Sequence, residues 1–263
     1  MSDLQLPPTL TATRDGDIAI LRLSRAAKRN ALDDETVLGL RRFFMAIPAG
    51  VGAVVLHGEG DHFSAGLDLS EVTGTTDVHS GMLHSQMWHK AFHDIQFGPV
   101  PVICVLHGAV VGGGLELASS THIRVAERST YYGLPEGQRG IFLGGGGSVR
   151  ITRLIGVHRV QYMMLTGHTL SAEEGHVAGI SQVLVENGQG LAKGIELARK
   201  VASNAAMSNY AIIQALPRIA ESDPASGFFT ESLMAAIAET TPEAQQRVRA
   251  FLEKRAAKMT PTG

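Results

Sequence analysis

One stretch of the chain combines the residue types that acid–base chemistry on a negatively charged intermediate requires. An apolar run, residues 100–106, is typical of a buried strand, and it is followed by three glycines, Gly112–Gly114, and by Glu116 on a predicted helix. Glycine allows a ligand to approach the backbone closely, and the start of a helix presents unpaired N–H groups. The stretch therefore suits a site that stabilises negative charge beside a carboxyl group, although the glycines alone are also compatible with tight packing of a helix on a strand.

The composition describes an ordinary globular protein. The chain has 263 residues, of which 44% are hydrophobic and 18% charged, so it is long enough to bury a sizeable core. Its net charge of −2 gives no electrostatic reason to expect a nucleic-acid partner.

The cysteine count and the apolar runs indicate a compartment. Cys104 is the only cysteine and lies inside an apolar run, so we expect a core residue and no disulfide within the chain, which fits a reducing compartment. The first ten residues lack the features of a signal peptide, and no apolar run approaches the about 20 residues of a membrane span. The sequence therefore predicts a soluble, cytoplasmic protein without a membrane partner.

Strand and helix patterns alternate over about the first 185 residues. The Asp15-Gly16 pair lies between two apolar or β-branched runs and predicts a hairpin over residues 9–23, and Asp33 and Asp34 are expected to cap a helix. Further strands are expected at 51–56, 100–106 and 122–126, and further helices at 81–97 and 149–155.

The remainder of the chain is predicted to be mainly helical. Ser171 and Glu174 have the spacing of a capping box, and Thr241-Pro242 is expected to start a last helix that ends near Lys258. Two more helices are expected at 191–206 and 207–219. The order of elements predicts an α/β fold with a helical C-terminal part.

Several chemical motifs fail on their spacing. Gly112–Gly114 do not fit the dinucleotide pattern G-x-G-x-x-G, no Lys-Ser/Thr pair follows Gly144–Gly147, and Ser64 lacks the setting of a nucleophile elbow. His89 and His93 have the spacing of a zinc pair but no evident third ligand, so we expect no metal site and no separate cofactor.

Three segments, taken in order, resemble the crotonase superfamily of acyl-CoA enzymes. They are residues 63–69 (FSAGLDL), residues 108–118 (GAVVGGGLELA), and Pro135-Glu136 followed by a glycine cluster, and the Asn30-Ala31 element precedes them. The resemblance covers roughly residues 10 to 255. It implies a crotonase-like spiral of ββα units, residues 1–190, with a helical region, residues 191–263, that serves oligomerisation and covers the active site.

The resemblance also implies roles for backbone and side chains in the site. It places the thioester oxygen between the N–H groups of Leu67 and Gly113, where negative charge builds up as an enolate forms. Both glutamates of the family's hydratases are matched, so Glu116 would activate water for attack at Cβ and Glu136 would deliver a proton to Cα. Position 144 is glycine, which disfavours the dienoyl isomerases, since these carry an aspartate there.

The resemblance also implies residues that contact coenzyme A and the acyl group, but the motifs for these contacts are less specific. The resemblance points to coenzyme A contacts at Arg25, Lys28, Ala65, Asp68 and Leu69. The basic residues of this loop, Arg29 included, also suit a solvated loop. Lys254 matches a position where some relatives contact the coenzyme A of a neighbouring subunit.

The helix expected at 81–97 falls where the family encloses the acyl group. Its soft and aromatic side chains suit a roomy apolar pocket for an acyl group bulkier than crotonyl, or else the plain core of an amphipathic helix. The residues expected to line the pocket are Met82, Met87, Trp88 and Phe92.

The function expected from this resemblance is hydration of a 2-enoyl-CoA to a 3-hydroxyacyl-CoA by a homotrimer or a dimer of trimers. The alternatives are isomerisation, thioester hydrolysis or decarboxylation on the same scaffold, and a non-catalytic relative that binds acyl-CoA or RNA. The two glutamates and the net charge of −2 argue against the non-catalytic relative.

Overall fold

The computed structural model describes residues 4–70 and 77–253, and its first element is the expected hairpin. Strands β1 (Leu10–Asp15) and β2 (Ile18–Leu23) pair antiparallel, with Leu10 opposite Leu23. Gly16 lies at the turn with φ 63°, a conformation that glycine adopts without steric cost.

The hairpin forms one edge of a six-stranded sheet in the order β1-β2-β3-β4-β6-β9. From β2 onward all neighbours pair parallel. The added strands are β3 (Ala53–Gly58), β4 (Val102–Leu106), β6 (Ile123–Glu127) and β9 (Val183–Val185). All five residues of β4 are buried, as expected for a parallel strand that is covered on both faces.

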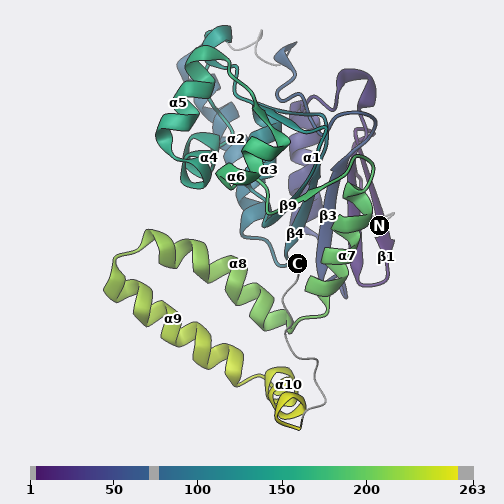
Figure 1. Cartoon of the computed structure of the whole chain (residues 1–263), viewed down its shortest axis with the longest axis vertical. Coiled ribbons are helices and arrows are strands. Elements are labelled where there is room, and N and C mark those ends of the chain that lie inside the picture. The colour runs from purple at the N-terminus through teal and green to yellow at the C-terminus, as the bar shows by residue number, and fades with distance from the viewer. Residues whose placement is uncertain (1–3, 71–76, 254–263) are drawn as a thin grey trace. The chain divides into compact units, whose positions relative to one another are not determined.

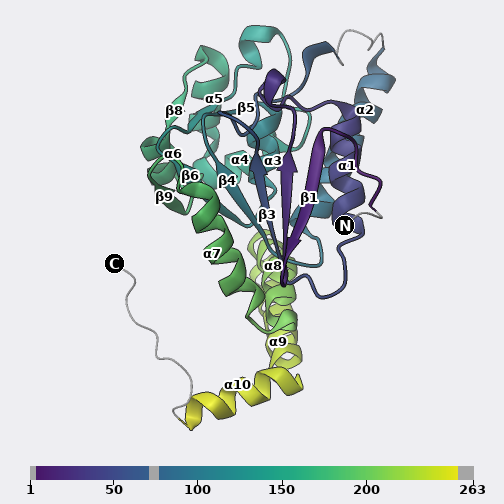
Figure 2. The ribbon, with the colours of Figure 1, turned by 90° about the vertical axis from the view of Figure 1, so that its right-hand side faces the viewer.

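Alternate residues of these strands belong to two separate cores. Val54 and Cys104 belong to the larger core, which also contains apolar side chains of α1 (Asp34–Met45) and α2 (Val78–Gln96). Val55 and Val105 face the smaller core, which is closed by α7 (Gly190–Ala202). The sheet is therefore a layer between helices (Figure 2). Burial in the larger core raises the pKa of the Cys104 thiol to about 12.

Three short strands form a second sheet in the order β5-β7-β8. They are β5 (Ala109–Val111), β7 (Tyr131–Gly133) and β8 (Leu170–Ser171). The sequence patterns did not indicate these strands, because two or three residues are too few to show a period of two. With β5 in place, the chain turns from β4 through β5 into the short helix α3 (Gly113–Ser119), which carries Glu116.

Caps set the helix boundaries. Asp33 accepts a hydrogen bond from the backbone N–H of Thr36 at the start of α1, and Asp77 caps α2, which starts three residues before the expected Gly81. The expected capping box of Ser171 and Glu174 is confirmed at the start of α6 (Ala172–Ala178). Helices α4 (Gly147–Ile155) and α5 (Val157–Thr166) precede it.

The chain divides into two compact units. The first runs to Ala202 and includes α7, whereas the boundary expected between residues 190 and 191 falls at the start of that helix. The second contains α8 (Ala206–Glu221) and α9 (Pro224–Glu239), which pack side by side (Figure 1), and α10 (Pro242–Leu252). Thr241 caps α10 as expected, while Lys254 and the end expected near Lys258 lie outside the described residues. No helix of the described residues is long and apolar enough to span a membrane.

Candidate active site

A cavity of about 330 Å³ lies in the first unit, at the start of α3. Both glutamates singled out by the sequence, Glu116 and Glu136, line it together with Leu67 and Gly113. The structure thus brings all four predicted residues together from three separate segments. The other lining residues are Gly81, His84, Ser85, Trp88, Ile141, Phe142, Leu143, Gly144 and Gly145.

Two backbone N–H groups meet at one side of this cavity. A Cβ atom on Gly66 would lie 3.1 Å from the nitrogen of Gly113, and a Cβ atom on Gly113 would lie 3.2 Å from the nitrogen of Leu67. Gly66 has φ 92°, and its Cβ would approach the carbonyl oxygen of Val111 to 2.6 Å, so only glycine fits there. Within residues 4–70 and 77–253, the N–H groups of Leu67 and Gly113 donate no hydrogen bond to the protein, as an oxyanion hole requires.

Buried polar contacts hold the loop that carries Leu67. The Ser64 hydroxyl donates to the carbonyl oxygen of Asn30 (2.8 Å) and accepts from the N–H of Gly66 (3.2 Å). The backbone of Leu32 makes hydrogen bonds to the two neighbours of Leu67. Its N–H donates to the carbonyl oxygen of Gly66, and its carbonyl oxygen accepts from the N–H of Asp68, each at 2.8 Å. These supports rest on contacts between distant segments, which the spacing of the residues did not reveal.

The glycine cluster binds the carboxylate of Glu116. The N–H groups of Gly145 and Gly147 both donate to Oε1 at 2.8 Å, and Glu116 is only 4% exposed. A Cβ atom on Gly147 would lie 2.6 Å from Cγ of Glu116, so the close approach requires glycine. The glycine cluster Gly144–Gly147 is therefore long because its backbone N–H groups bind the Glu116 carboxylate at the start of α4.

Opposing effects act on the pKa of Glu116. Burial raises the pKa of Glu116 above its ordinary value, and the N–H groups of Gly147 and Gly145 and the charge of Arg150 offset only part of that rise. Arg150 is itself held, because its Nε donates to Gln96 (2.7 Å) and its guanidinium to the carbonyl oxygen of Gly145 (3.1 Å). The hydrogen bonds from Gly145 and Gly147 fix Oε1 of Glu116 in place.

Glu136 has a pKa suited to an acid near neutral pH. Burial and, to a smaller extent, the negative charge of Glu116 together raise the pKa of this carboxyl group to about 7. The side chain is 6% exposed, and its Oε2 has no hydrogen-bond partner among the described residues. A protonated Glu136 can therefore donate a proton into the cavity.

The raised pKa of Glu136 predicts a pH-dependent cost in stability. The group stabilises the fold below its ordinary pKa of 4.5 and loses that contribution as the pH rises through about 7, because the buried carboxylate must then form. The shift corresponds to about 3 kcal/mol. We expect Glu136→Gln to melt at a higher temperature than the wild type at pH 8, with the difference shrinking at pH 5. A difference independent of pH would contradict the raised pKa.

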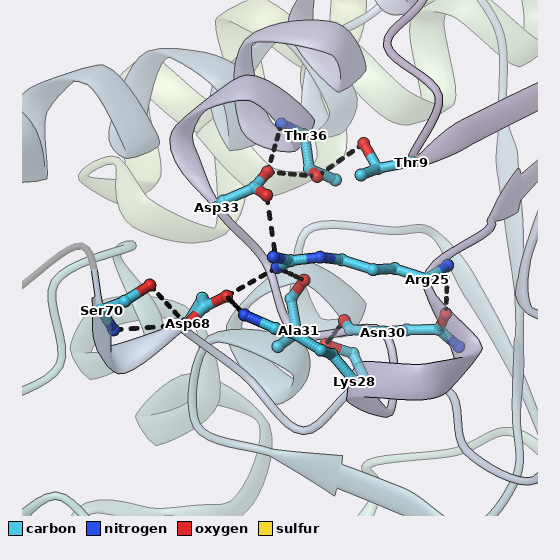
Figure 3. Close-up of polar contacts among 10 residues, drawn as sticks. Thr9, Arg25, Lys28, Asn30, Ala31, Asp33, Thr36, Asp68 and Ser70 are labelled. Carbon is cyan, nitrogen blue, oxygen red and sulfur yellow. Dashed lines mark hydrogen bonds and ion pairs between the residues drawn. The ribbon is translucent and has the colours of Figure 1, made fainter.

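The residues expected to contact coenzyme A form an ion-pair cluster (Figure 3). Asp68 accepts hydrogen bonds from Arg25 (2.8 Å) and Lys28 (3.0 Å), and Arg25 also pairs with Asp33 (3.2 Å). Lys28, Ser70 and Arg25 hold the pKa of Asp68 well below its usual range. The cluster joins the loop around Arg25 to the loop that follows Leu67, so it supports the site whether or not it touches coenzyme A.

Two other predicted contact residues lie on the same loop. The N–H of Ala65 donates to the carbonyl oxygen of Arg29 (2.9 Å), and the side chain of Leu69 is exposed. The side chain of Lys28 is 56% exposed, so its ammonium group can still reach a ligand. Contact of these residues with coenzyme A stays a prediction.

The four residues expected to line the acyl pocket all lie on α2, but they differ in whether they face the cavity, the core or solvent. Among the described residues that line the cavity, Trp88 is the only one of the four. Met82 is 56% exposed, Met87 is half-buried against the larger core, and Phe92 is fully buried with its ring edge-to-face on Trp88. The apolar walls come instead from Ile141, Phe142 and Leu143, which sequence reasoning missed because their segment has no periodic pattern.

Comparison with known proteins identifies the family. The family profile described as enoyl-CoA hydratase/isomerase matches residues 13–261. The short-chain-enoyl-CoA hydratase of Clostridium acetobutylicum is 29% identical, and the alignment covers 92% of this chain and 94% of that protein. The fatty acid oxidation complex subunit alpha of Shewanella frigidimarina is 33% identical over 72% of this chain, which spans only 28% of that longer protein.

Solved structures agree with the profile. A protein of Rhodopseudomonas palustris, described as a "putative enoyl-CoA hydratase", is 54% identical with a TM-score of 0.92 over 95% of this chain and 97% of that chain. The enoyl-CoA hydratase of Bacillus anthracis is 28% identical with a TM-score of 0.87, over 94% of this chain and 97% of that chain. The expected α/β crotonase fold is therefore confirmed, and the chain belongs to the enoyl-CoA hydratase/isomerase family of the crotonase superfamily.

Proposed function

We propose that this protein is an enoyl-CoA hydratase that adds water to a 2-enoyl-CoA and forms a 3-hydroxyacyl-CoA. One observation carries the proposal: two buried glutamates line the same cavity as two backbone N–H groups without a partner in the described protein. The names of the relatives support the same chemistry, and the family implies an acyl-CoA substrate.

The reaction follows from these positions. The thioester oxygen accepts hydrogen bonds from the N–H groups of Leu67 and Gly113, which stabilise the negative charge of the enolate. Glu116 takes a proton from water as the water oxygen bonds to Cβ, and the electron pair of the double bond moves onto the thioester. Glu136 then gives its proton to Cα as the carbonyl re-forms, and proton exchange between the two carboxyl groups restores the starting state. Both carboxyl groups line the same cavity. We infer that they act on the same face of the double bond, which gives syn addition.

Exposed apolar side chains on the second unit support association of the chain with further copies of itself, and we propose trimers or dimers of trimers. Large apolar side chains are exposed on its two longest helices, including Leu216 on α8 and Phe228, Phe229 and Leu233 on α9. Such surfaces are commonly covered by another protein molecule. Light scattering on the purified protein is expected to give the mass of three or six chains, and the mass of one chain would contradict the assembly.

A mixture of 2-enoyl-CoAs tests the reaction itself. We expect the purified protein to convert at least one of them into a product heavier by one water, as detected by mass spectrometry. A product of unchanged mass with a shifted double bond would indicate an isomerase. Release of free coenzyme A or loss of carbon dioxide would indicate a hydrolase or a decarboxylase.

A further inference from the structure

The acyl cavity has one polar group that the hydration reaction does not use. Its walls are mostly apolar, and besides the two glutamates only His84 and Ser85 contribute polar side chains among the described lining residues. The hydroxyl of Ser85 donates to the carbonyl oxygen of Gly144 at 2.6 Å and is occupied. His84 is bonded through Nε2 to Asp34, and its Nδ1 has no hydrogen-bond partner in the described part of the chain.

Asp34 fixes the protonation pattern of this histidine. Its Oδ1 accepts hydrogen bonds from Nε2 of His84 (2.8 Å) and from Nε1 of Trp88 (3.3 Å). A carboxylate only accepts, so the hydrogen of the His84 ring lies on Nε2 and the lone pair of the neutral ring lies on Nδ1. His84 and Trp88 are four residues apart on α2 and share one face of that helix.

Trp88 connects His84 to the reacting end of the cavity. Its Cζ3 lies 3.0 Å from the position that a Cβ atom on Gly113 would take, while its Nε1 reaches Asp34. The indole thus spans the wall between the oxyanion glycine and the Asp34–His84 pair, and the centroids of the His84 and Trp88 rings are 6.0 Å apart. An acyl chain that starts at Gly113 and follows the indole ends near His84.

We propose that His84 recognises a hydroxyl group at the far end of the acyl chain, a specificity that rests on the proposed hydratase function. A hydroxyl matches both states of the ring, because it donates to a neutral Nδ1 and accepts from a protonated one. A terminal methyl group would bury Nδ1 without a partner. A terminal carboxylate would meet the negative charge of Asp34, which is bonded to the same ring. The cavity volume of about 330 Å³ lies within the range of ligand pockets.

A matched control variant distinguishes substrate recognition by His84 from a purely structural role of the Asp34–His84 pair. The pair joins α1 to α2, and a second ion pair, Arg41 Nε to Asp94 Oδ2 at 2.8 Å, joins the same two helices. Asp94→Asn removes that second link without touching the cavity. If His84 only fastened the helices, Asp94→Asn and His84→Leu would have similar effects on substrate preference.

The test measures kcat/KM for a series of 2-enoyl-CoAs of increasing length, each with a terminal methyl, hydroxyl or carboxylate group. We expect the wild type to favour the hydroxyl form about tenfold over the methyl form at the best-fitting length. His84→Leu is expected to remove this preference while hydrating the methyl form, and Asp94→Asn is expected to keep it. Asp34→Asn, which leaves His84 in place but frees its ring, is expected to weaken the preference and serves if His84→Leu does not fold.

Binding of saturated acyl-CoAs with the same three ends, measured by calorimetry, gives a readout that does not depend on hydration. Equal affinity for the methyl and hydroxyl forms, a preference for carboxylate, or an unchanged preference in His84→Leu would overturn the assignment of His84. Absence of hydration with every substrate, together with a preserved hydroxyl preference in binding, would instead count against the proposed hydratase function alone.

Discussion

Glu116→Gln is expected to lower kcat for hydration by about 10²–10⁴-fold, because the amide cannot take a proton from water. The carbonyl oxygen of glutamine can still accept the hydrogen bonds that Gly145 and Gly147 donate at 2.8 Å, so the fold and the binding of substrate are expected to persist. Steady-state kinetics should therefore show a large fall in kcat with little change in KM.

A surface glutamate provides the control for this variant. Glu173 is exposed and pairs with Arg128 at 2.7 Å, away from the cavity lining. Glu173→Gln is expected to keep the wild-type kcat. A Glu116→Gln enzyme that hydrates at the wild-type rate would contradict the role of Glu116 as the base.

Gly113→Ala is expected to lower kcat by about 10²–10³-fold, as much as the loss of one donor of an oxyanion hole, because the added methyl group would block access to the N–H group that alanine retains. Its Cβ would lie 3.2 Å from the nitrogen of Leu67 and 3.0 Å from Cζ3 of Trp88, in the space that the thioester oxygen must occupy. Gly113 begins α3, where alanine is a better helix former than glycine. We therefore expect the activity to fall without a matching fall in melting temperature.

Gly133→Ala is a matched change outside the cavity. A Cβ atom there would meet Cγ2 of Thr169 at 3.4 Å, which is an ordinary contact. This variant is expected to retain activity. If Gly113→Ala were as active as Gly133→Ala, the N–H groups at Leu67 and Gly113 would not hold the reacting oxygen.

Parts of the fold with long regular patterns could be predicted from the sequence. The hairpin at β1 and β2 has a turn dipeptide between two strands, and α1 and α6 have capping side chains that act locally. Strands β5 and β8 have three and two residues, so their pairing depends on contacts with distant segments. Local patterns carry no information about such contacts.

The site shows the same division. The positions of Leu67, Gly113, Glu116 and Glu136 follow from the resemblance to the crotonase superfamily, and the structure places them around one cavity. The grip of Gly145 and Gly147 on Glu116 could not be predicted, because it depends on two segments about thirty residues apart meeting at hydrogen-bond distance. The acyl pocket was predicted only at Trp88, since helical spacing does not tell a cavity wall from a core face.

Incubation of a 2-enoyl-CoA in heavy-oxygen-labelled water, with the wild type and with Glu116→Gln side by side, tests the central claim most directly. The wild type is expected to form a 3-hydroxyacyl-CoA that carries the label on Cβ, and Glu116→Gln is expected to form almost none in the same time. An unlabelled product of the wild type, or equal labelling by both proteins, would contradict water addition at the paired glutamates.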